Sequence, residues 1–136
     1  MIVDNLVFDA SVILGWLEEG RQGEAARVIH SDVIKGKISA WVPDFVFVEV
    51  MNILYWKKKL PLDDINAFLD RILTAGIQVD DTPLRLEIHN VLLLVVRYRI
   101  SAYDAQYLRL AQRLNAKLVS FDKELLQIKE WVVAPS

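Results

Sequence analysis

Short apolar runs that are typical of β-strands alternate with helical patterns along the whole chain. We expect strands at residues 6–8, 38–42, 77–79, 117–120 and 131–133. Strands that alternate with helices form a parallel sheet, because each connecting helix crosses one face and returns the chain to the same edge. The sequence therefore predicts one α/β domain over residues 1–136, with a central parallel sheet flanked by helices in three layers.

Proline marks the expected starts of three helices. Helical patterns cover residues 11–19, 24–35, 43–60, 61–74, 83–97 and 101–114, and a short helix follows residue 122. Pro43, Pro61 and Pro83 are each placed at a first helical residue, where the N–H that proline lacks has no helical partner anyway. With 54% hydrophobic residues, the chain has enough apolar material for a core between these layers.

Glu49 is the polar residue that is hardest to explain in the apolar segment 45–54. A carboxylate removed from water loses hydration worth on the order of several kcal/mol unless a cation compensates its charge. No Lys or Arg lies between Lys37 and Lys57, so the local sequence offers no cation. Asn52 follows three residues later and shares one helix face with Glu49. The alternative is an exposed Glu on a helix whose other faces are buried.

Three further acids stand where strands end or helices begin. Asp9 and Asp122 follow expected strands, and Asp104 lies in the first turn of the helix from residue 101. Because ligands collect beyond the carboxyl ends of parallel strands, these acids and Glu49 could meet at one edge of the sheet. Carboxylates about 4 Å apart repel by roughly 4 kcal/mol per pair at an effective dielectric constant of about 20. Such a group needs a divalent cation, and oxygen ligands without His or Cys favour Mg²⁺ or Mn²⁺.

Helix capping is the ordinary explanation for three of these acids. Asp9 and Asp122 could accept backbone N–H groups as N-caps, and Ser101 with Asp104 matches a capping box. No cap explains Glu49, so the combination is more informative than any single acid.

In order and spacing, four short motifs resemble those of the PIN-domain family, in particular its small single-domain VapC-type toxins. The motifs are residues 7–11, 49–52, 103–105 and 118–122, and the resemblance covers essentially the whole chain. It implies four catalytic, metal-binding acids in one pocket: Asp9, Glu49, Asp104 and Asp122. It also implies three supporting residues, namely Ser11 and Ser120 as hydroxyl partners and Asn52, which would steady Glu49.

The same resemblance implies an activity and partners. The chain would be a Mg²⁺- or Mn²⁺-dependent endoribonuclease, the toxin of a type II toxin–antitoxin pair, which hydrolyses RNA to leave a 5′-phosphate and a 3′-hydroxyl. Its partners would be RNA, a second copy in a homodimer, and an antitoxin that wraps the domain and places a basic or bulky side chain in the pocket. Apolar helix faces in residues 60–73 and 84–96 are consistent with a homodimer.

Other functions stay open on the sequence. His30 and His89 could form an acid–base pair for metal-free RNA cleavage, although nothing in their spacing brings them together. A phosphoryl-accepting domain would use Asp9 as nucleophile, but Ser11 stands where such folds carry a second acid. A PIN-like module that binds RNA or protein without cleavage is the main alternative.

The lysine run 57–59 could contact phosphates. Lysines at a helix C-terminus also complement the helix dipole, and we favour this second explanation.

Charge and cysteine content limit the setting. The formal net charge is −2, so no overall basic field attracts nucleic acid, and any contact with it must be local or mediated by metal. The chain has no cysteine, which excludes disulfides and zinc–thiolate sites. Its first residues lack the basic and apolar segments of a signal peptide, and we expect a cytoplasmic protein.

Overall fold

Five parallel strands form one sheet in the order β3-β2-β1-β4-β5 in the computed structural model, which describes residues 3–136. The strands are β1 (Asp4–Phe8), β2 (Ile38–Pro43), β3 (Gln78–Asp80), β4 (Lys117–Val119) and β5 (Val132–Val133). Residues 1 and 2 of the predicted domain lie outside the described part. Central β1 is the core of the sheet, and its Val7 and Phe8 are fully buried. The prediction of a parallel sheet is confirmed.

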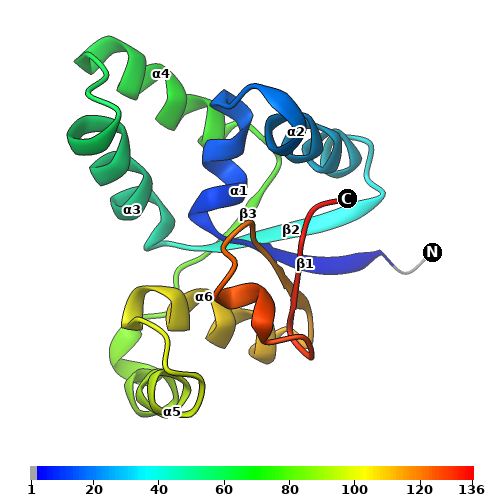
Figure 1. The fold of residues 1–136 in the computed structure, drawn as a ribbon, viewed down its shortest axis with the longest axis vertical. Coiled ribbons are helices and arrows are strands. Elements are labelled where there is room, and N and C mark those ends of the chain that lie inside the picture. Colours follow the sequence, from blue (N-terminus) through cyan, green and yellow to red (C-terminus); the bar gives the residue numbers. More distant parts are fainter. Residues whose placement is uncertain (1–2) are drawn as a thin grey trace.

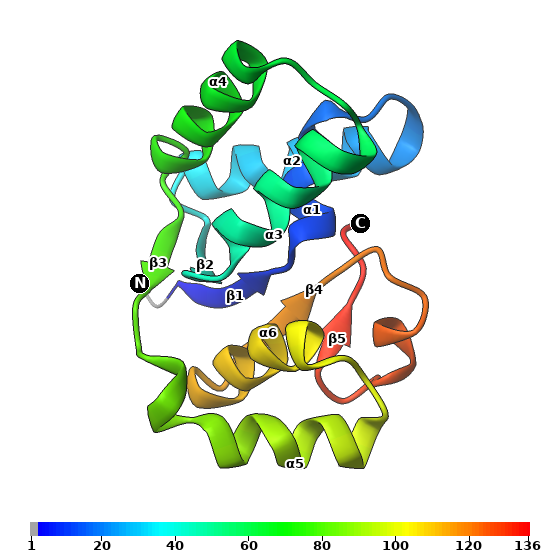
Figure 2. The same cartoon turned by 90° about the vertical axis from the view of Figure 1, so that its left-hand side faces the viewer.

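Helices cover both faces of this sheet (Figures 1 and 2). The α-helices are α1 (Ala10–Leu14), α2 (Gly20–Ile34), α3 (Val46–Asn52), α4 (Leu62–Leu73), α5 (Ile88–Tyr98) and α6 (Ala102–Arg113). Helices α1 to α4 lie on one side and α5 and α6 on the other, so the three-layer prediction is confirmed (Figure 2). Shorter turns are η1 (Gly15–Leu17), η3 (Leu84–Leu86), η4 (Leu125–Gln127) and the π-helix η2 (Ile53–Lys57). Within residues 3–136, none of the helices is long and apolar enough to cross a membrane.

The predicted helix over residues 43–60 differs most from the structure. Pro43 ends β2 in register with Asp80 of β3, and the N–H of Asp44 donates to the Asp80 carbonyl at 3.0 Å. Pairing with a strand far along the chain therefore decides the conformation of Pro43, and local sequence does not show it. The helix begins only at Val46, so the prediction of a helix start at Pro43 was wrong.

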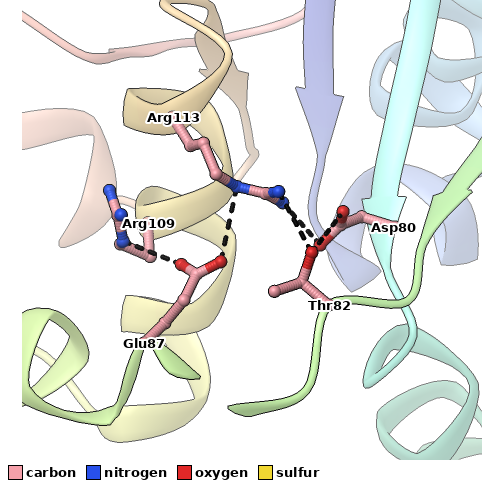
Figure 3. A network of polar contacts seen from close by, with 5 residues as sticks. All are labelled: Asp80, Thr82, Glu87, Arg109 and Arg113. Carbon is pink, nitrogen blue, oxygen red and sulfur yellow. Dashed lines mark hydrogen bonds and ion pairs between the residues drawn. The ribbon is translucent and has the colours of Figure 1, made fainter. Parts of the chain in front are cut away.

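A network of charges fixes α6, the helix that carries Asp104 (Figure 3). Arg113 contacts Asp80 at 2.6 Å, donates to Thr82 at 3.0 Å and reaches Glu87 at 3.4 Å. Arg109 meets Glu87 at 2.7 Å as a charge contact rather than a directed hydrogen bond. Burial alone would raise the pKa of Asp80, but the hydrogen bond and charge of Arg113 outweigh it and hold that pKa below its usual range. The network ties α6 to the segment between β3 and α5.

Candidate active site

The four predicted acids line one open pocket of about 680 Å³. Asp9 follows β1 as the N-cap of α1, and Asp122 lies just after β4, so both stand beyond carboxyl ends of strands. Glu49 lies in α3 and Asp104 in the first turn of α6. Helices α3 and α6 cover opposite faces of the sheet (Figure 2), so both helical layers contribute acids to the pocket. Four elements that are distant in sequence therefore supply the acids.

Asp9 is held by three hydrogen bonds and is only 5% exposed. Its Oδ1 accepts from the Ser11 hydroxyl at 2.6 Å and the Val12 N–H at 3.2 Å, and its Oδ2 accepts from the Ser120 hydroxyl. The bond from Val12 is a helix N-cap, so Asp9 is a capping residue as well as a pocket residue. Ser11 also accepts the N–H of Phe121 at 3.0 Å. Both predicted hydroxyl partners thus contact Asp9 and join the ends of β1 and β4.

Asp122 and Asp104 are positioned by hydrogen bonds that involve backbone N–H groups. The N–H of Asp122 donates to the Ser120 hydroxyl at 2.9 Å, and its Oδ1 accepts the N–H of Glu124 at 2.8 Å. The N–H of Asp104 donates to the Ser101 hydroxyl at 3.0 Å, which makes Ser101 the N-cap of α6. Short local turns therefore direct each acid, while the sheet brings the turns together.

Two of the carboxyl groups have raised pKa values. Burial raises the pKa of Asp9 from 3.8 to about 6, although hydrogen bonds from the two serines and a backbone N–H lower it. Burial, together with the negative charges of Asp122 and Glu49, raises the pKa of Asp104 from 3.8 to about 6. Asp104 in turn raises the pKa of Asp9. The acids are thus close enough to repel one another, and a cation between them would favour their charged forms.

Glu49 finds its hydrogen-bond donor in Tyr107, a residue that the sequence analysis did not single out. The Tyr107 hydroxyl donates to Oε1 of Glu49 at 2.6 Å. Tyr107 is fully buried, and burial together with the charge of Glu49 raises its pKa well above the usual range, so the hydroxyl keeps its proton. The sequence does contain one indication of Tyr107. It follows Asp104 by three residues, and residues three apart share a helix face.

Asn52 does not take the position predicted for it. Its side chain is exposed and lines a separate apolar pocket with Trp56 and Leu62, whereas Glu49 lines the acid pocket. Three residues of an α-helix fall about 60° short of a full turn, and that offset directs the two side chains to different pockets. The group that contacts Glu49 is Tyr107 rather than Asn52.

Removing the Tyr107 hydroxyl tests this contact. We expect Tyr107→Phe to lower the unfolding free energy by about 1–3 kcal/mol, because a carboxylate among like charges loses its donor. Urea unfolding at neutral pH measures the loss. Tyr103→Phe is the matched control, since Tyr103 lies on the same helix, is 60% exposed, and stacks its ring on Phe45 at 5.4 Å. An unchanged stability of Tyr107→Phe would show that the bond contributes nothing.

The fit of the pocket to a metal ion depends on the ion. Within residues 3–136, no three His, Cys, Asp or Glu side chains lie close enough together to hold one. The pocket is therefore not a closed cage of the kind that structural zinc uses. Mg²⁺ commonly binds through one or two carboxylates, while waters and substrate phosphates complete its shell. Carboxylates placed around an open space suit that mode of binding.

The two histidines lie away from the pocket. His30 on α2 stacks on Trp16, with ring centroids 4.3 Å apart, and its Nε2 lies 3.1 Å from the carbonyl of Ala75. His89 is exposed on α5, on the opposite face of the sheet (Figure 2). They cannot act together as an acid and a base, which removes the metal-free histidine mechanism.

Comparison with known proteins gives a family and a fold. The PIN domain model matches residues 6–130. A crystal structure of PAE2754 from Pyrobaculum aerophilum is 24% identical, with a TM-score of 0.68 over 97% of this chain and 89% of that chain. VapBC2 from Rickettsia felis, bound to a DNA fragment from their promoter, is 12% identical, with a TM-score of 0.70 over 97% of this chain and 99% of that chain. FitAcB from Neisseria gonorrhoeae is 14% identical, with a TM-score of 0.65 over 96% of this chain and 97% of that chain. No curated protein matches the chain in sequence.

Proposed function

The chain belongs to the PIN domain family, and on that premise we propose that it is a metal-dependent endoribonuclease that hydrolyses RNA phosphodiester bonds. The observation that supports this most is the single pocket lined by Asp9, Glu49, Asp104 and Asp122. The raised pKa values of Asp9 and Asp104 add support, because crowded carboxyl groups of this kind are typical of functional sites.

The acids have different proposed roles. Asp9 and Asp104 hold Mg²⁺ or Mn²⁺, because both line the pocket and have the raised pKa values that a cation would reverse. Oδ1 of Asp9 accepts two hydrogen bonds, whereas Oδ2 accepts only that of Ser120, which leaves one lone pair of Oδ2 for a metal, since each carboxylate oxygen has two. Glu49 and Asp122 complete the pocket, and one of them takes a proton from the attacking water. The bound ion supplies a lower pKa for that water and neutralises charge on the phosphate.

A cleavage assay on the whole protein tests the proposal. The protein is incubated with RNA in the presence of Mg²⁺, Mn²⁺ or EDTA, and the product ends are identified. We expect cleavage with either metal, none with EDTA, and products that carry a 5′-phosphate and a 3′-hydroxyl. Cyclic phosphates formed in EDTA would contradict the metal mechanism. Retained RNA binding without cleavage in any arm would instead favour a non-catalytic PIN-like module.

We further propose that the protein is the toxin of a toxin–antitoxin pair. Two similar structures are VapBC2 bound to a DNA fragment from their promoter and FitAB bound to a DNA fragment, and the sequence motifs of this chain resemble those of VapC-type toxins. In this chain, the negatively charged pocket would accept a basic side chain of an antitoxin. Addition of the cognate antitoxin should then abolish RNA cleavage.

A homodimer is proposed from the outer face of α5. Leu92, Leu93 and Val96 are 57%, 65% and 69% exposed on this helix. A contiguous apolar surface of this kind usually marks an interface. We expect Leu93→Glu with Val96→Glu to convert a dimer to a monomer, because two charges would be buried at the contact. Light scattering at micromolar concentration measures the mass. The control is Val48→Glu, because the Val48 side chain is 61% exposed on the opposite helical layer. A monomeric wild type would contradict the proposal.

A further inference from the structure

Two lysines reach the rim of the acid pocket from the π-helix that follows α3. Helix α3 ends at Asn52 and continues as η2 (Ile53–Lys57), in which the N–H of Lys58 donates to the carbonyl of Ile53 at 3.0 Å, five residues back. Lys57 and Lys58 both line the pocket, together with Ile53 and Glu49. Single π-turns of this kind are rare and occur frequently at functional sites.

The π-turn explains why these lysines face the acids. Each α-helical residue turns the helix by about 100°, whereas each residue of the wider π-turn turns it by roughly 80°. Four α steps followed by four π steps bring Lys57 back to about the face of Glu49. An unbroken α-helix would direct Lys58, nine residues after Glu49, to about the opposite side of the helix. The π-turn moves it to within about a quarter turn of Glu49 instead.

Lys58 is held at this rim by an exposed ion pair. Its Nζ lies 2.6 Å from Oε1 of Glu18, and the two side chains are 32% and 47% exposed. Arg27 fixes the backbone here, since its Nη1 donates to the Glu18 carbonyl at 2.8 Å. Exposed ion pairs stabilise a fold little and are weakened by salt. The pair therefore positions the ammonium group and leaves it available to a phosphate.

We propose that Lys57 and Lys58 bind backbone phosphates of the nucleic-acid strand beside the scissile bond; this inference rests on the proposed nuclease function. The chain has a net charge of −2 and the pocket is lined by acids, so both repel a polyanion. The cations that line the pocket are these two lysines. They offset the repulsion where the strand must enter. The dipole of the helix, which alone could explain a lysine run, does not account for their place at the pocket.

Binding of a short labelled single-stranded RNA of mixed sequence, measured in EDTA as a function of salt, tests the proposal without cleavage. We expect Lys57→Gln with Lys58→Gln to weaken binding about tenfold at low salt, and to make the slope of log affinity against log salt shallower by about 1.4, because each phosphate contact on a single strand contributes about 0.7. Lys57→Arg with Lys58→Arg should bind like the wild type, since both charges are kept.

Lys59→Gln is the matched control. Lys59 is the adjacent exposed lysine but does not line the pocket. It should bind RNA with nearly the wild-type affinity and salt slope. An unchanged affinity of the double variant, or an equal loss with Lys59→Gln, would overturn the phosphate role while wild-type cleavage left the nuclease proposal intact. A wild type that neither binds nor cleaves RNA would overturn both proposals. Circular dichroism confirms that each variant is folded.

Discussion

Asp104→Asn is expected to abolish metal-dependent RNA cleavage and to leave thermal unfolding nearly unchanged. The amide keeps the size of the side chain but removes a charged oxygen ligand, so we expect a loss on the order of a hundredfold or more, about 3 kcal/mol in activation free energy. Stability should not fall, because the change also relieves repulsion from Asp122 and Glu49. In the wild type this repulsion is the second cause, next to burial, of the raised pKa of Asp104. Initial cleavage rates and a melting curve measure the two effects.

Asp63→Asn is the matched control for this variant. Asp63 lies in the first turn of α4, as Asp104 does in α6, so both substitutions remove a carboxylate that interacts with a helix N-terminus. Asp63 is exposed and does not line the pocket, and its variant should cleave RNA at the wild-type rate. Full activity of Asp104→Asn, or an equal loss with Asp63→Asn, would refute the role of Asp104.

Asp9 is expected to make the metal-free protein less stable as the pH rises from about 4 to 6. Burial raises its folded pKa from 3.8 to about 6, so the native state binds this proton more tightly than the unfolded chain does. The stability that comes from Asp9 is therefore fully present below pH 3.8 and is lost as the pH rises through about 6. The two pKa values correspond to about 3 kcal/mol of unfolding free energy.

The pH effect is measured as a difference between the wild type and Asp9→Asn. Urea unfolding in EDTA at several pH values should show the wild type losing about 3 kcal/mol relative to the variant between pH 4 and pH 7. At pH 7, Mg²⁺ at a hundred times its dissociation constant should stabilise the wild type by about 2.7 kcal/mol and the variant much less. Parallel stability curves for the two proteins would show that Asp9 titrates as an ordinary exposed carboxyl group. Equal stabilisation by Mg²⁺ would argue against Asp9 as a ligand.

Most elements of the fold could be predicted because their signals are local. The C-terminal half of β1 is apolar and is followed by Asp9, whose carboxylate caps α1 within three residues. Ser101 likewise caps α6 through the N–H of Asp104. Such contacts depend only on neighbouring residues. Pro43 was misplaced because its conformation depends on pairing with β3, a partner that lies far along the chain.

The position of the candidate site could be predicted, but not its contacts. Residues at the carboxyl ends of parallel strands share one edge, and this rule placed Asp9 and Asp122 near each other without coordinates. The spacing of Tyr107 from Asp104 indicates a shared helix face, but the hydrogen bond from Tyr107 to Glu49 spans the two helical layers, and no local pattern predicts that contact. The π-turn that directs Lys57 to the pocket was also not predicted, since the apolar segment before it fits an ordinary α-helix. The catalytic and metal-binding roles of the four acids stay predictions.

By itself, the sequence determined the alternation of strands and helices, the parallel sheet and the edge at which the acids gather, because periodicity and capping act over a few residues. Only the tertiary structure decided how the acids are held. It buried Asp9 under two serines, paired Glu49 with Tyr107 and turned Lys58 toward the pocket. Those contacts depend on how the two helical layers pack across the sheet, and packing joins residues whose separation along the chain carries no signal.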